Sequence, residues 1–181
     1  MKPASLVALA LLTTASLAAP VDVLQWRGPN RDGIFPSTDL LKQWPANGPK
    51  LAWKAEKLGK GMASVTIAGG KIYTTTGRDE GQFIVALDAS TRAELWAAKI
   101  THDLGEPRCT PTIDGDRVYA VSTYGDLVCV NAADGKLKWR KSYAKHFGNP
   151  TKPIWEFSES PLVDGDKLIV VPPAKETPWA Q

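Results

Sequence analysis

Cysteine is scarce in this sequence, with only two among 181 residues. Cys109 and Cys129 occupy the places of the small residues Ala63 and Ala86 in an internal repeat. If one strand separates them, they lie about 10 Å apart, which is beyond the reach of a disulfide. We therefore expect no disulfide and predict that both cysteines are small buried residues.

A strong net charge and a long apolar run are also missing. The formal charge of +3 falls to +2 without Lys2, and the basic residues are scattered among acidic ones. This is far too little for the basic footprint of a nucleic-acid-binding protein. Beyond the first eighteen residues no stretch of 18 apolar residues occurs, so we expect no nucleic acid partner and no membrane insertion.

The first eighteen residues have the pattern of an export signal. Lys2 precedes the apolar run "LVALALL" (6–12), and Ser16 and Ala18 are the small pair that a signal peptidase accepts. No cysteine lies at the cleavage point, so a lipid anchor is not expected. The pattern predicts cleavage after Ala18 and a periplasmic or secreted chain.

An internal repeat dominates the rest of the sequence. The segments "SVTIAGGKIYTTT" (64–76), "TPTIDGDRVYAVS" (110–122) and "SPLVDGDKLIVV" (160–171) each read as a strand, a turn and a second strand. Their turns contain Gly69, Gly115 and Gly165. Such short turns between apolar runs are typical of β-hairpins.

The second half of the repeat ends on tryptophan. "FIVALDASTRAELW" (83–96) matches "LVCVNAADGKLKW" (127–139), a third strand, a turn and a fourth strand. Trp53, Trp96 and Trp139 stand 43 residues apart, then 43 again. Four short strands per unit predict one antiparallel sheet per repeat.

The strand composition predicts how these sheets pack. The inner strands are apolar or β-branched on both faces, so both faces must be covered, whereas the last strand of each unit alternates with charges outward. A four-stranded sheet covered on both sides by copies of itself is a propeller blade, so we predict an all-β fold, a β-propeller of four-stranded antiparallel blades. Each tryptophan is predicted to fill the gap where neighbouring blades splay apart, burying on the order of 200 Å².

The repeat resembles that of PQQ-type (pyrroloquinoline-quinone-like) propellers. The likeness rests on "ALDASTRAELW" (86–96) and "CVNAADGKLKW" (129–139), and "WRGPNRDGIFP" (26–36) and "FSESPLVDGDK" (157–167) are similar to exported, outer-membrane-assembly-like members. One position departs from the repeat pattern. Arg92 replaces the turn glycine that Gly135 keeps, at a cost of roughly 1 kcal/mol if φ is positive, so that turn is expected to be built differently.

Counting repeat units predicts an incomplete ring. We expect an irregular lead-in at 19–48 and a partial propeller at 49–181. The propeller would consist of an outer strand at 49–54, blades at 64–99 and 110–142, and an incomplete blade at 160–181. The resemblance implies an eight-bladed ring, so we expect an N-terminal fragment of a longer protein whose missing blades close the ring.

The connections between blades carry the candidate site residues. In a propeller these connections return to the central axis, where ligands are generally met. The candidates for an axial rim are His102, Arg108, His146, Trp155, Glu156 and Glu159. The competing interpretation is that they are surface loop residues, because two isolated histidines form no metal-ligand spacing and the "DGD" turns at 114–116 and 164–166 lack further calcium ligands. We therefore predict no metal site and identify no catalytic residue.

Two functions from different classes fit this sequence. The first is a non-catalytic binding or scaffold module, whose partner is a protein or small molecule that the sequence does not identify. The second is a quinoprotein dehydrogenase that oxidises alcohols or sugars with PQQ and calcium; the resemblance implies an adjacent cysteine pair and a calcium ligand set for such enzymes, and neither can be placed on this sequence. Carbohydrate binding by Trp155 and Phe157 is a weaker third hypothesis. No cofactor is evident outside the dehydrogenase hypothesis.

Overall fold

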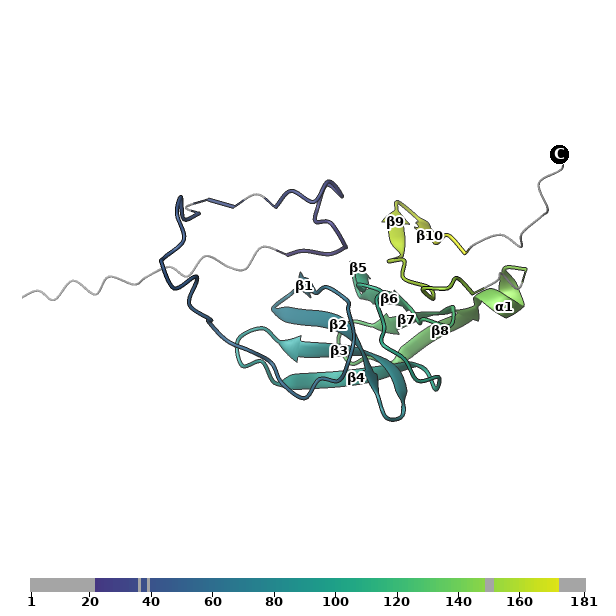
Figure 1. Cartoon of the computed structure of the whole chain (residues 1–181). Helices are drawn as coiled ribbons and strands as arrows, with labels where there is room; N and C mark the ends of the chain where they lie inside the picture. Colours follow the sequence, from purple (N-terminus) through teal and green to yellow (C-terminus); the bar gives the residue numbers. More distant parts are fainter. Residues whose placement is uncertain (1–21, 36, 39, 149–151, 173–181) are drawn as a thin grey trace, which may run out of the picture.

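The computed structural model describes residues 22–35, 37–38, 40–148 and 152–172 (Figure 1). The predicted signal peptide at 1–18 lies outside these residues, as does the end of the incomplete blade, 173–181. Within the described residues, no helix is long and apolar enough to cross a bilayer.

Two four-stranded antiparallel sheets follow each other along the chain. The first contains β1 (Thr66–Ala68), β2 (Lys71–Arg78), β3 (Gly81–Asp88) and β4 (Glu94–Thr101). The second contains β5 (Thr112–Asp114), β6 (Arg117–Val121), β7 (Asp126–Asn131) and β8 (Leu137–Ser142). The short helix α1 (Tyr143–His146) leads to a hairpin of β9 (Leu162–Asp164) and β10 (Lys167–Ile169). The prediction of an all-β fold with four-stranded antiparallel sheets is confirmed.

The first hairpin of each sheet turns on a glycine at an equivalent place. Gly69, Gly115 and Gly165 have φ of +53°, +55° and +59°. No atom comes within 4 Å of a Cβ built on any of them. Backbone conformation rather than crowding therefore favours glycine in these turns.

The third strands, β3 and β7, lie in the core. Seven of the eight residues of β3 are buried, and β7 is buried from Leu127 to Val130. One face of β3 joins the core shared with the second sheet, and the other packs under Ala55 and Leu58 of the preceding segment. The outer strand β8 is buried at no residue. Apolar strands covered on both faces are what the sequence predicts for blades.

Trp96 lies where the two sheets meet. Its ring is 5.8 Å from that of Tyr73, between centroids. A Cβ built on Gly135 would stand only 2.6 Å from Trp96 Cε3. The tryptophan that ends the first sheet therefore packs directly on the β7–β8 turn of the second, as predicted for a packing wedge.

Trp53 makes the equivalent contact one blade earlier, although no outer strand forms around it. The expected strand at 49–54 is not a strand in the structure, because no partner strand lies beside it among the described residues. Trp53 is 45% exposed. Its ring nevertheless lies 5.0 Å from the Arg92 guanidinium, in the turn that corresponds to that of Gly135.

The turn at Arg92 is built like its glycine counterpart, so the expectation of a different turn is wrong. Arg92 has a φ of +65° and its N–H donates to Asp88 O at 2.8 Å, while Gly135 N–H donates to Asn131 O at the same distance. The Asp88 carboxylate accepts hydrogen bonds from the N–H groups of Ser90 and Thr91, at 2.9 and 2.7 Å. These bonds and the cation–π contact with Trp53 offset the strain of a non-glycine residue.

The two cysteines are buried and free, as predicted. Cys109 Sγ accepts a hydrogen bond from Val121 N–H of the neighbouring strand at 3.2 Å. Burial raises the pKa of the Cys109 thiol to about 12. The thiol therefore stays protonated near neutral pH.

Gly135→Ala tests the contact between blades. We expect a loss of about 2 kcal/mol or more in the free energy of unfolding, since the new methyl group adds a clash with Trp96 to the strain of a positive φ. Gly115→Ala is the matched control, because Gly115 also has a positive φ but open space around it, and its cost should stay near 1 kcal/mol. Urea unfolding measures the free energy of unfolding of both variants. Equal losses in the two variants would contradict the contact between Trp96 and the Gly135 turn.

Candidate functional site

The connections between consecutive blades and the turns between second and third strands lie at the same end of the sheets, because neighbouring strands run in opposite directions. We call this end the loop face; it consists of residues 79–80, 102–111, 122–125 and the described part of 143–161. The turns with Gly69, Gly115 and Gly165 lie at the opposite end. The candidate residues predicted from the sequence all belong to the loop face.

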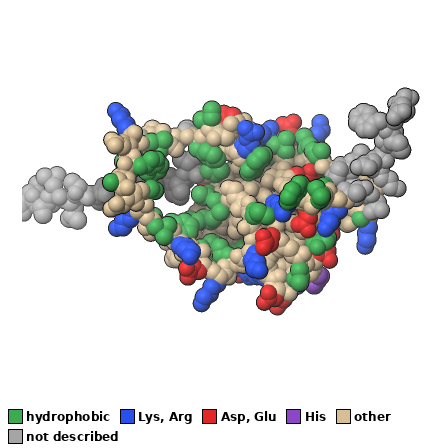
Figure 2. All heavy atoms as spheres, viewed as in Figure 1, with side chains coloured by type: hydrophobic (Ala, Val, Ile, Leu, Met, Phe, Trp, Pro, Cys, Tyr) green, Lys and Arg blue, Asp and Glu red, His purple; other side chains and the backbone are tan. Residues whose placement is uncertain are grey.

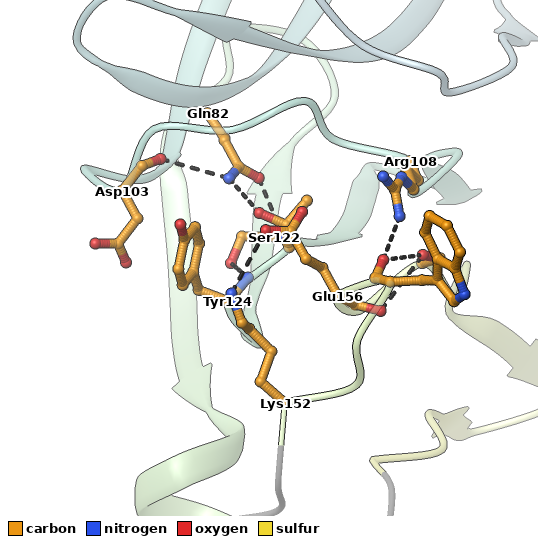
Figure 3. Close-up of polar contacts among 10 residues, drawn as sticks. Gln82, Asp103, Arg108, Ser122, Tyr124, Lys152 and Glu156 are labelled. Carbon is orange, nitrogen blue, oxygen red and sulfur yellow. Dashed lines mark hydrogen bonds and ion pairs between the residues drawn. The ribbon is translucent and has the colours of Figure 1, made fainter.

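Gln82 joins the two complete blades under this face. It is fully buried at the start of β3. Its Nε2 donates to Thr123 Oγ1 at 2.5 Å and to Asp103 O at 3.4 Å, and its Oε1 accepts from Thr123 N–H at 3.0 Å (Figure 3). A buried amide with all its groups partnered fixes how the blades sit against each other.

Ser122 shapes the turn that Gln82 contacts. Its Oγ accepts from the N–H of Tyr124 at 3.2 Å (Figure 3). It also accepts from the N–H of Asp126 at 3.0 Å. Gly125 follows with a φ of +84°, and a Cβ there would lie about 3 Å from Phe157 and Tyr143. The turn therefore requires glycine for both conformation and space.

The segment from 152 onward is anchored to this turn from the other side. Phe157 N–H donates to Thr123 O at 3.2 Å. The buried rings of Phe157 and Tyr143 meet edge to face, with centroids 5.1 Å apart. Thr123 thus connects the first blade, the second blade and the segment that leads to the third.

Arg108, Trp155 and Glu156 are brought together by the structure. Arg108 Nη1 and Ser158 Oγ both donate to Trp155 O, the latter at 3.3 Å. Lys152 Nζ lies 3.5 Å from Glu156 Oε1 (Figure 3). The same ammonium group also lies 4.4 Å from the centroid of the Tyr124 ring. Three of the predicted candidates therefore belong to one compact cluster.

The remaining candidates make local contacts elsewhere. His102 Nδ1 lies 3.4 Å from Lys99 Nζ, and His146 Nδ1 lies 3.0 Å from Ser142 N beside α1. Glu159 accepts hydrogen bonds from Tyr143 O–H and from Val171 N–H, the latter at 3.0 Å. Burial, and then the hydrogen bond to Glu159, raise the pKa of the Tyr143 hydroxyl, so it remains a donor.

The ends of Ile154 and Trp155 point to solvent. Glu156 N–H donates to Pro153 O at 2.8 Å, which makes residues 153–156 a turn with Ile154 and Trp155 at its two central positions. Ile154 is 92% and Trp155 74% exposed. The turn at 153–156 therefore presents two large apolar side chains on a hydrogen-bonded backbone.

A hollow of about 490 Å³ opens at the margin of the loop face. It is lined by glycines and by Lys60, Arg78 and Glu106, among others. Arg78 is already engaged, since Nη2 lies 2.6 Å from Glu94 Oε2 and Nε donates to Leu58 O at 3.0 Å. Lys60, Asp79 and Glu106 also line the hollow, and among the described residues their side chains make no hydrogen bond or ion pair.

The described residues contain no group of three or more His, Cys, Asp and Glu side chains placed to hold a metal ion.

A double-mutant cycle tests the buried bridge. Gln82→Leu removes the hydrogen-bond partner of the Thr123 hydroxyl and of the Thr123 N–H. We therefore expect it to lower the free energy of unfolding by about 2 kcal/mol or more. Adding Thr123→Val should recover part of that loss, with a coupling energy of about 0.5–3 kcal/mol. Urea unfolding gives the values, and Gln43→Leu, at an exposed glutamine, is the control. Additive losses would show that the two side chains do not interact.

This architecture is similar to that of a known protein family. A family model described as outer membrane protein assembly factor BamB matches residues 80–180. No curated protein matches the chain. Since the family match covers more than half of the chain, it identifies the family.

Three solved structures are similar to parts of this chain. A europium-containing methanol dehydrogenase is 19% identical over 66% of this chain, with a TM-score of 0.51. A quinohemoprotein alcohol dehydrogenase from Comamonas testosteroni is 18% identical over 61% of the chain, with a TM-score of 0.49, and BamB from Moraxella catarrhalis is 20% identical over 52%, with a TM-score of 0.37. The chain spans 22%, 17% and 24% of these structures, respectively. At this identity, the likeness to the methanol dehydrogenase supports the fold alone.

The four-stranded sheets, the internal repeat and the family match lead to one conclusion. This chain is a partial β-propeller that belongs to the PQQ-like family of outer membrane protein assembly factor BamB.

Proposed function

We propose that this protein is an exported, non-catalytic binding module that contacts a partner protein through the turn at 153–156. The observation that carries the proposal is the exposure of Ile154 and Trp155 at the tip of that turn. Exposing two adjacent large apolar side chains has a cost in water, which binding to a partner removes.

The turn is suited to binding because its backbone is already fixed. Arg108 and Ser158 hold the Trp155 carbonyl, and the Phe157 ring is buried behind it. A tryptophan on a fixed backbone has less conformational entropy to lose on binding than one on a mobile loop, and tryptophan is frequently a hot spot of protein interfaces. A partner with an apolar pocket would bury both side chains without ordering the loop first.

The contacts of the polar candidate residues favour a structural role for them over a catalytic one. Arg108 donates to a backbone carbonyl, Glu156 pairs with Lys152, and Glu159 accepts from Tyr143. These groups brace the loop face. A scaffold needs such bracing, whereas a general acid or base needs a free titratable group facing the substrate.

Export is part of the proposal and is supported by the pattern of the first eighteen residues. Lys2, the apolar run at 6–12 and the small residues Ser16 and Ala18 favour cleavage after Ala18. Expression in a Gram-negative host followed by mass spectrometry of the periplasmic fraction should show a chain beginning at Ala19. An uncleaved chain confined to the cytosol would contradict export.

Site-specific cross-linking tests the binding surface. A photoreactive phenylalanine analogue at position 155 should yield a discrete protein adduct in intact cells, while the same analogue at Leu137, an exposed position on β8, should not. With the identified partner, Ile154→Ala and Trp155→Ala should each weaken affinity about tenfold or more, and Leu137→Ala should not. Adducts equally frequent at both positions would contradict the proposed surface.

Thermal unfolding with PQQ and Ca²⁺ distinguishes the proposal from the dehydrogenase hypothesis. The binding module should show no saturable rise in Tm, because it has no affinity for the quinone. A rise that saturates with PQQ and requires Ca²⁺ would favour a quinoprotein.

A further inference from the structure

The first strand of each sheet has one edge that is not paired within its own sheet. β1, β5 and β9 each stand at the end of their sheet and pair with one strand only. In a propeller this first strand borders the central channel, so its free edge faces the axis. Unpaired N–H and C=O groups on such an edge invite pairing with other polypeptides.

The lead-in segment occupies this edge on the first two blades. Val23 and Ile67 exchange two backbone hydrogen bonds, each of 2.8 Å, in the pattern of an antiparallel pair. Leu24 O then accepts from Ile113 N–H, also at 2.8 Å. Ile67 and Ile113 are the middle residues of β1 and β5, so two consecutive lead-in residues engage equivalent positions on consecutive blades.

Arg31 extends the contact to the third blade. Its Nη2 donates to the carbonyl of Val163 at 2.5 Å, and Val163 is the middle residue of β9. The same guanidinium donates from Nε to Gln25 Oε1 at 3.2 Å. Gly33 N–H donates to Arg27 O at 3.0 Å and closes the loop. The arginine is therefore held by its own loop while it reaches across to β9.

The segment lies toward the hairpin-turn end of the strands. Asp22 Oδ1 accepts from the N–H of Gly69, in the β1–β2 turn, at 3.2 Å. The loop face is at the opposite end. In the space-filling view, hydrophobic side chains reach the surface over the lead-in segment, and charges of both signs are scattered over the rest of that face (Figure 2).

We propose that residues 22–35 form an axial clasp that caps the inner edges of three successive blades. The clasp makes these edges unavailable for strand addition by other polypeptides. It also lies across the axial side near the hairpin turns, which leaves the loop face as the open approach to the axis. The inference is independent of which partner the loop face binds.

Hydrogen exchange measured by NMR on the full chain tests the clasp. The amides of Ile67 and Ile113 should exchange about tenfold or more slowly than that of Val163, which holds the same position in β9. The reason is that the clasp contacts Val163 through its carbonyl, while its N–H has no backbone partner among the described residues.

Two arginine variants separate the clasp from a general effect on the loop. Arg31→Ala should speed exchange at Ile67 and Ile113 about tenfold, because the loop loses its attachment to β9. Arg27→Ala is the matched control, since Arg27 also has a positive φ, and it should leave both amides unchanged. Equal exchange at Ile67, Ile113 and Val163 in the unmodified chain would overturn the proposal, and so would identical exchange in the two variants.

Discussion

The contact between Trp96 and the Gly135 turn sets the geometry on which the rest of the structure depends. A four-stranded sheet whose third strand is apolar on both sides is not stable alone in water, because both of its apolar faces would stay exposed. The indole covers the widening gap between two such sheets, and Gly135 leaves room for it because a Cβ there would stand 2.6 Å from Trp96 Cε3. The tryptophan recurs at a fixed interval, and the facing turn accommodates it either with a glycine, as at Gly135, or with a cation–π contact, as between Arg92 and Trp53.

Buried hydrogen bonds also hold neighbouring blades together. Gln82 crosses from the first blade to Thr123 of the second, and Phe157 continues from Thr123 toward the third. Such buried hydrogen bonds tolerate little displacement, so they define the relative position of blades more sharply than apolar packing does. The loop face inherits this rigidity, which is why a short turn there can hold Ile154 and Trp155 outward.

The fold could be predicted from the sequence because its determinants recur. Trp96 and Trp139 follow one spacing, and Gly69, Gly115 and Gly165 mark equivalent turns, so periodicity alone indicates the sheets. The strand expected around Trp53 did not form, since a repeat motif predicts a strand only where partner strands exist. Arg92 kept the glycine turn because Trp53 and Asp88 compensate locally, and a repeat pattern does not reveal such compensation.

The site was less predictable. The sequence predicts Arg108, Trp155 and Glu156 as candidates from their place in connections between blades, and the structure brings these three together (Figure 3). Gln82 and Thr123 were missed, although a lone amide at the start of an otherwise apolar strand was a signal; its partner lies 41 residues away and no periodicity indicates it. NMR gives the most direct test of the central contact: the Gly135 α-protons should be shifted upfield by the Trp96 ring and show strong NOEs to its indole protons. Unshifted α-protons without those NOEs would contradict the account.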